Sequence, residues 1–247
     1  MMKKISKLAL LAAATAFLLA AFPACSDEDD GNEPTPTVKP GDGDGGEGGG
    51  SSTPATAKEY NFVGLAISDF PEGTITAKDD GNALSAFVSG ADNYIKTKTE
   101  VSVKDATLYG GKNNLRIRAT NDVSTALNYN GGESADISSG ATISDLSRYV
   151  KIHIDGAGTV TASIKAVNSS NNSGTLQIAL VDKDGKLIGD LVTANVADGK
   201  IAGSDATTGT VTGTVTAATD VYLVLSRNGA SGGGMDVYSI AAAPAAN

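Results

Sequence analysis

His153 is the only histidine in the chain, so it is the first side chain to examine for catalysis or metal binding. A single histidine excludes a site built on two histidine ligands, and a serine–histidine–aspartate arrangement would need partners that the sequence does not mark. His153 also alternates with Ile152 and Ile154, which is the pattern of a strand with one apolar face. We therefore interpret it as a partly exposed strand residue.

The other polar residues do not form a recognisable catalytic set. Polysaccharide lyase chemistry needs a basic residue to take a proton and usually a cation to neutralise the uronate. The arginines are scattered, and no acidic cluster accompanies them; they are Arg116, Arg118, Arg148 and Arg227. The stretch Asp182-Lys183-Asp184-Gly185 has the start of a calcium loop but lacks the acidic residue at its far end, so it is interpreted as a hairpin turn. The sequence thus predicts no enzyme, no cofactor and no set of metal ligands.

Tyrosines are the side chains best suited to bind a sugar. Sugar-binding surfaces usually stack a ring on an aromatic side chain that is surrounded by hydrogen-bonding groups. The chain has seven tyrosines and no tryptophan, so any stacking must fall to tyrosine. The candidate ligand-binding residues are Tyr109, Tyr129 and Tyr149, because a glycine pair or a strand end lies next to each. The alternative is that each is a strand residue at the edge of the core.

The stretch from Tyr149 to Val167 is the element around which the fold is expected to form. Apolar residues recur at every second position on both sides of Gly156-Ala157-Gly158; they are Val150, Ile152 and Ile154, then Val160, Ala162, Ile164 and Ala166. This pattern predicts a half-buried antiparallel hairpin. The apolar face of a one-sided sheet must be covered, and the flanking segments also predict strands, so we expect a second sheet to cover it.

Short strands separated by turns are expected along the rest of the domain. They cover residues 60–65, 73–76, 100–103, 107–109, 115–119, 126–129, 175–181, a return from Lys186, 208–216, 221–226 and 235–240. Residues 82–90 stay open between one helical turn and a loop. No helical period of any length occurs, so the predicted fold class is all-β: a two-sheet antiparallel β-sandwich.

Residues 1–24 have the features of a secretion signal: lysines near the start, then an apolar run from Leu8 to Phe22. The run is shorter than the roughly 20 residues that a membrane span needs. Phe22-Pro23-Ala24-Cys25 resembles a bacterial lipobox, in which the cysteine becomes the lipidated first residue of the mature chain. The resemblance implies a lipid attached to Cys25 and a membrane anchor at the N-terminus. The alternative is an ordinary cleaved signal followed by a free cysteine.

Residues 25–58 are expected to form a disordered tether that precedes a folded domain over residues 59–243. Ser26 and the four acidic residues after it, 27–30, resemble the tract that directs some bacterial lipoproteins to the outer face of the outer membrane; the alternative is a solvated charge run. The segment PTPTVKPGDGDGGEGGGSSTP has too few apolar residues to form a core. The expected location is the bacterial outer membrane, with the domain at the cell surface.

Charge and cysteine usage narrow the classes of partner. The net charge is −9, which disfavours nucleic acid and anionic membrane surfaces. Cys25 is the only cysteine, so no disulfide within the chain can stabilise the domain. Stability is therefore expected to come from sheet packing.

The order of strand ends resembles the jelly-roll accessory modules of bacterial polysaccharide lyases of the pectate-lyase type. The motifs that carry the resemblance are Tyr60-Asn61-Phe62, Leu115-Arg116-Ile117, Val150-Lys151-Ile152, Val221-Tyr222-Leu223 and Met235-Asp236-Val237. The resemblance implies a carbohydrate-associated module without the parallel β-helix that carries catalysis in those enzymes, and it leaves a structural calcium open. The leading hypothesis is a non-catalytic lipoprotein that binds a polysaccharide or glycan. The alternative is an adhesin that binds a protein through its loops.

Overall fold

The computed structural model describes residues 53–77, 82–88, 92–96, 98–111, 115–118, 125–130, 133–169 and 172–245. The expected signal, Cys25 and the tether as far as residue 52 lie outside the described residues. All of these residues belong to one compact unit.

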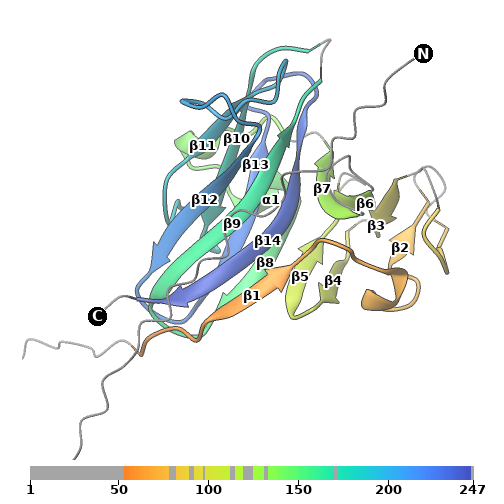
Figure 1. Cartoon of the computed structure of the whole chain (residues 1–247), viewed down its shortest axis with the longest axis horizontal. Coiled ribbons are helices and arrows are strands. Elements are labelled where there is room, and N and C mark those ends of the chain that lie inside the picture. Colours follow the sequence, from red (N-terminus) through yellow and green to blue (C-terminus); the bar gives the residue numbers. More distant parts are fainter. Residues whose placement is uncertain are drawn as a thin grey trace, which may run out of the picture. The chain divides into compact units, whose positions relative to one another are not determined.

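Strands of the described residues form an eight-stranded and a six-stranded sheet, and all pairs of named strands are antiparallel. In spatial order the first sheet comprises β12 (Thr208–Val215), β9 (Gly158–Val167), β14 (Gly234–Pro244), β7 (Ala126–Asn130), β6 (Leu115–Arg118), β3 (Asn93–Ile95) and β2 (Ile75–Thr76), with β1 (Lys58–Asn61) beside β14 (Figure 1). The second sheet comprises β11 (Val192–Asn195), β10 (Thr175–Val181), β13 (Thr219–Ser226), β8 (Tyr149–Ile154), β5 (Ala106–Tyr109) and β4 (Glu100–Val103). The predicted all-β, two-sheet antiparallel sandwich is confirmed.

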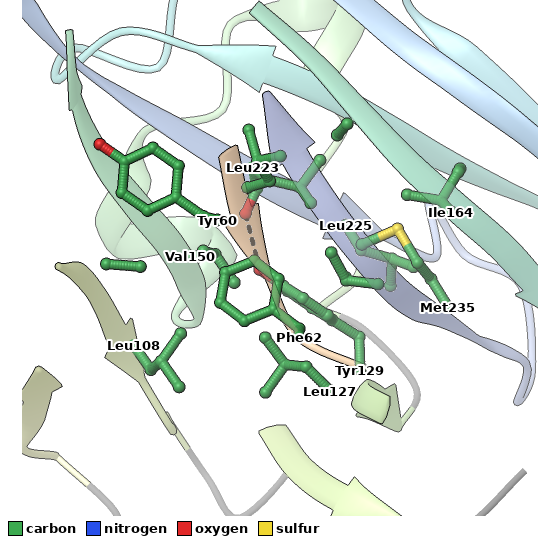
Figure 2. Packing of buried hydrophobic residues seen from close by; sticks show 14 of the residues in the cluster. Tyr60, Phe62, Leu108, Leu127, Tyr129, Val150, Ile164, Leu223, Leu225 and Met235 are labelled. Carbon is green, nitrogen blue, oxygen red and sulfur yellow. Dashed lines mark hydrogen bonds between the residues drawn. The ribbon is translucent and has the colours of Figure 1, made fainter. Parts of the chain in front are cut away.

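Alternating burial along the strands creates the core between the sheets. In β9 every second residue from Gly158 to Ala166 is buried and the residues between them are half-buried. In β8 the buried residues are Val150, Ile152 and Ile154, as the period of two predicts. Figure 2 shows side chains from both sheets, among them Val150, Leu223, Ile164 and Met235, meeting in one apolar cluster. Burial of this cluster is the main favourable contribution to folding.

The predicted hairpin between residues 149 and 167 does not form. β8 pairs with β5 and β13 in the six-stranded sheet, whereas β9 pairs with β12 and β14 in the eight-stranded sheet. The period of two is therefore correct, but the apolar faces of the two strands cover each other across the core instead of lying side by side. Residues 155–157 carry the chain from one sheet to the other.

Residues before β1 pair with this crossover. Ala157 donates its amide to the carbonyl of Thr53 at 2.8 Å, and Ala55 donates to the carbonyl of Ala157 at 2.7 Å. A Cβ atom at Gly156 would lie 2.3 Å from the Thr53 carbonyl oxygen, so only glycine fits there. The last residues of the expected tether thus contact the sandwich.

The expected strand bounds agree with the structure within a few residues, and two strands are reproduced without change: β4 and β10. The short strand β3 was not expected. The strand that returns beside β10 is β11, which begins at Val192 and not at Lys186; nearer the turn only an isolated bridge joins Val181 and Leu187. Residues 82–88 contain no helix, and Ala83 instead forms a bridge with Thr76. None of the described helices is long and apolar enough to cross a membrane.

A short helical segment covers part of the outer face of the six-stranded sheet. It contains η2 (Ile137–Ser139) and α1 (Ile143–Leu146), while the single turn η1 (Ile67–Asp69) lies elsewhere in the sequence. Thr142 caps α1 and accepts a hydrogen bond from the amide of Asp145. Ile137 and Leu146 pack in a second, smaller core with residues of β10 and β13, namely Ala179, Val181 and Val224.

Candidate ligand-binding surface

Three tyrosines gather on the outer face of the six-stranded sheet. The rings of Tyr109 and Tyr149 are stacked, with centroids 5.1 Å apart and planes 19° from parallel. The ring of Tyr222 meets that of Tyr149 edge-on, also at 5.1 Å. All three side chains are half-buried. We call this group the tyrosine cluster.

Strand register accounts for the cluster. Tyr109 of β5 lies directly opposite Tyr149 of β8, and Lys151 of β8 lies opposite Tyr222 of β13. Tyr149, Lys151 and His153 alternate with buried residues of β8, so they share the outer face. Cross-strand neighbours on one face of an antiparallel sheet lie close enough for their side chains to touch.

Polar side chains surround the cluster and bond to it. The Tyr149 hydroxyl donates to Oε1 of Glu100 at 2.7 Å, and Nζ of Lys151 donates to the same oxygen at 3.0 Å. On the neighbouring strand pair, Nδ1 of His153 lies 2.8 Å from Oδ1 of Asp220. The side chains of Glu100, His153 and Asp220 are 47%, 65% and 43% exposed, so a ligand in solvent can reach them.

Protonation follows from these contacts. The hydrogen bond from Tyr149, then that from Lys151, lowers the pKa of Glu100. Partial burial, then the hydrogen bond to Glu100, raises the pKa of Tyr149. Partial burial lowers the pKa of Lys151, but the hydrogen bond and charge of Glu100 outweigh it and the net shift is upward. At neutral pH the neutral phenol of Tyr149 therefore lies beside a carboxylate and an ammonium group.

The structure separates the three tyrosines that the sequence put forward. Tyr109 and Tyr149 belong to the cluster, whereas Tyr129 is fully buried in the core. Its hydroxyl donates to the carbonyl of Leu223 at 2.7 Å, as Figure 2 shows. The glycine pair after Tyr129 suggested a loop, but period-two alternation in β7 turns its ring toward the other sheet. Tyr129 is therefore not available to stack on a ligand.

Sequence reasoning did not select Tyr222, Glu100, Lys151 or Asp220. The alternation in Val221-Tyr222-Leu223 could have placed Tyr222 on an outer face, since its neighbours are buried. The cluster depends on the pairing of β8 with β5 and with β13. This pairing could not be inferred from the sequence, so the cross-strand contacts could not be predicted.

The other candidate sites are structural. Asp182 to Gly185 form the predicted turn, in which Oδ1 of Asp182 accepts hydrogen bonds from the amides of Asp184 and Lys186, both at 2.9 Å. Within the described residues no group of three or more histidine, cysteine, aspartate or glutamate side chains could hold a metal ion. His153 is exposed, as its alternation predicts.

Taken together, the fold and this surface define the class: an antiparallel β-sandwich with an aromatic and polar patch on one outer face. No family model matches the chain, and no curated protein matches it. Solved structures similar to it include a carbohydrate-binding module, TmCBM27, described for specific mannan recognition, at 10% identity and a TM-score of 0.39, over 78% of this chain and 99% of that one.

Two further solved structures show similarity. One is a family 6 carbohydrate-binding module from Clostridium cellulolyticum in complex with xylose, at 18% identity and a TM-score of 0.30, over 53% of this chain and 87% of that one. The other is the isomalto-dextranase of Arthrobacter globiformis T6 complexed with panose, at 12% identity and a TM-score of 0.31, over 76% of this chain and 32% of that one.

Proposed function

We propose that this chain is a surface-anchored, non-catalytic lipoprotein whose β-sandwich binds a polysaccharide through the tyrosine cluster. The observation that carries the proposal is the joint placement of Tyr109, Tyr149 and Tyr222 among exposed polar side chains. Sugar rings have apolar faces and hydroxyl edges, so they bind where an aromatic surface lies beside hydrogen-bond donors and acceptors. Glu100 and Asp220 supply acceptors there, and Lys151 supplies a donor.

A binding assay with purified protein against immobilised polysaccharides tests the cluster. Aromatic side chains at the centre of a binding surface often contribute more than 1 kcal/mol, so Tyr109→Ala and Tyr222→Ala should each weaken binding by about tenfold. The matched control is Tyr238→Ala, which removes a half-buried strand tyrosine from the eight-stranded sheet and should leave affinity unchanged. Melting curves must show that each variant is folded.

Other outcomes identify the alternatives. If no polysaccharide binds and the protein instead captures a protein from host or neighbouring cells without competition by sugar, the adhesin hypothesis replaces this one. Unsaturated products from pectin in a lyase assay would contradict the non-catalytic part of the proposal.

The lipid anchor rests on the lipobox-like residues 22–25, and the outward orientation rests on Ser26 and the acidic residues 27–30. Cys25→Ser should move the protein out of the membrane fraction, because stable attachment needs more than one acyl chain and all of them depend on this cysteine. A serine variant that still sediments with outer membranes contradicts the anchor. Protease treatment of intact cells tests the orientation, since only a domain at the cell surface is cleaved.

A further inference from the structure

A hollow of about 390 Å³ lies at one end of the sandwich, and arginine and asparagine are prominent in its lining. Arg116 and Arg118 of β6 alternate with the core residues Leu115 and Ile117, so their side chains leave the sheet on the side away from the core. On the neighbouring strand β7, Asn128 and Asn130 follow the same alternation. Arg227, which follows β13, completes the rim.

Arginine is concentrated at this end of the sandwich. The chain has four arginines in 247 residues, and three of them line the hollow. The fourth, Arg148, is buried beside it and donates to the carbonyl of Asn130 at 3.5 Å and to Oε1 of Glu133 at 3.2 Å. All four arginines of a chain with a net charge of −9 therefore lie at one end of the sandwich, where Asp92 pairs with Arg116 and Glu133 pairs with Arg148.

Hydrogen bonds fix the guanidinium of Arg116. Its Nε donates to Oδ1 of Asn128 at 2.8 Å, and its Nη1 pairs with Asp92. Nδ2 of Asn128 in turn donates to Oδ1 of Asp236 at 2.6 Å, and Asp236 is buried. The carboxylates of this network hold Arg116 and Asn128 in place but do not line the hollow. Among the described residues that line it, the charged ones are all arginines.

We propose that this hollow binds an oxyanion, and that the oxyanion is the carboxylate or sulfate group of an acidic saccharide. Guanidinium groups match the two-oxygen geometry of carboxylate and sulfate better than lysine does, and side-chain amides bind neighbouring hydroxyls. The volume lies within the range of small-molecule sites. The saccharide part of this inference rests on the proposed function: the polysaccharide that the lipoprotein is proposed to bind would be an acidic one. The oxyanion part rests on the arginines alone.

Calorimetric titration with four probes tests the inference: an oligogalacturonate, a sulfated oligosaccharide, a neutral oligosaccharide of equal length and inorganic sulfate. One charged hydrogen bond contributes about tenfold or more in affinity, so Arg118→Gln and Arg227→Gln should each weaken binding of the acidic saccharide by at least that factor. Arg118→Lys keeps the charge but loses the planar fork, so its loss should be smaller. Lys183→Gln makes the same change of charge in an exposed turn and should have no effect.

The outcomes separate the two proposals. Acidic saccharide that binds the wild type and is lost in the arginine variants supports the inference, even if Tyr109→Ala and Tyr222→Ala leave polysaccharide binding unchanged and the proposed tyrosine surface fails. Inorganic sulfate that binds as tightly as the saccharides, with the same dependence on arginine, supports the oxyanion site and overturns the saccharide. The inference is overturned if none of the anionic probes binds. It is also overturned if the acidic saccharide binds Arg118→Gln and Arg227→Gln as tightly as it binds the wild type. Melting curves establish that the variants are folded.

Discussion

Tyr129 of one sheet bonds to Leu223 of the other: the tyrosine hydroxyl donates to the leucine carbonyl across the core at 2.7 Å (Figure 2). Burial raises the pKa of this phenol, so it stays a donor at any physiological pH. The bond joins β7 in the eight-stranded sheet to β13 in the six-stranded sheet. This hydrogen bond therefore fixes the distance between the two strands, in a core whose other contacts are mostly apolar.

Tyr129→Phe should lower the free energy of unfolding by about 1 kcal/mol, because it removes one buried hydrogen bond and keeps the ring. Chemical denaturation with a constant slope measures this loss. Tyr109→Phe is the matched control. The Tyr109 ring is half-buried, so removing its hydroxyl should lower the free energy of unfolding by less. Equal losses in the two variants would contradict the role of the bond to Leu223.

Ile152 and His153 test the register of β8. Ile152 is 1% exposed in the core, so Ile152→Asp buries a carboxyl without a partner and should cost several kcal/mol of a total of about 5–15. The His153 side chain is 65% exposed and pairs with Asp220 at the surface, so His153→Ala should cost within roughly 0.5 kcal/mol. Thermal melts of the two variants compare them directly. If His153→Ala lost much stability and Ile152→Asp lost little, the register of β8 would differ by one residue from the one described.

The faces of the strands could be predicted from the sequence, whereas their partners could not. The period of two between Tyr149 and Val167 gives the same buried residues whether the strands form a hairpin or face each other across a core. What decides between these is the crossover, where residues about 100 positions earlier, Thr53 and Ala55, pair with Ala157. A contact over that separation leaves no local signal in the sequence.

The candidate site, too, was predictable in part: single residues could be proposed from the sequence, but their neighbours on other strands could not. Tyr109 and Tyr149 could be chosen from composition and from nearby glycine or strand ends, but the choice of Tyr129 used the same reasoning and named a core residue. Tyr222 completes the cluster only because β13 pairs with β8. The arginines look scattered in the sequence, and β6 and the end of β13 bring three of them to one hollow.

Gly156 is expected to tolerate no side chain. A methyl group there would meet the backbone of Thr53 and Pro54 at 2.3 and 2.7 Å, so Gly156→Ala should lower the free energy of unfolding by about 1–3 kcal/mol. Hydrogen exchange adds a local measurement, because the amides of Ala55 and Ala157 should lose protection as their pairing opens.

Gly209→Ala is the control for that substitution. Gly209 lies in β12 and not in the crossover, and a methyl group there would make ordinary contact with Ile201 at 3.4 Å. The stability of the Gly209→Ala protein should change little or rise, since alanine restricts the backbone conformations of the unfolded chain. Retained protection at Ala55 and Ala157 in Gly156→Ala would show that the crossover can accept a side chain.

Asp136 should give the stability of the helical segment a specific pH dependence. Its carboxylate accepts hydrogen bonds from Ser138, Gln177 and Ser139, and these lower its pKa to about 2 from the ordinary 3.8. Because the folded pKa lies below the unfolded one, the contribution to stability is complete above pH 3.8 and is lost as the pH falls toward 2. The difference in unfolding free energy between wild type and Asp136→Asn should therefore shrink across this window.

Ser138→Ala tests the cause of the shift with the carboxylate still present. The hydroxyl of Ser138 donates to Oδ1 of Asp136 at 2.6 Å and is the largest single cause of the lowered pKa. Removing it should raise the pKa of Asp136 toward its ordinary value, although the bond from Nε2 of Gln177 at 2.8 Å keeps part of the shift. A carbon-detected NMR titration of the carboxyl group measures this directly. An unchanged midpoint in Ser138→Ala, or a constant stability difference for Asp136→Asn between pH 4 and 2, would mean that this carboxylate does not hold the segment against β10.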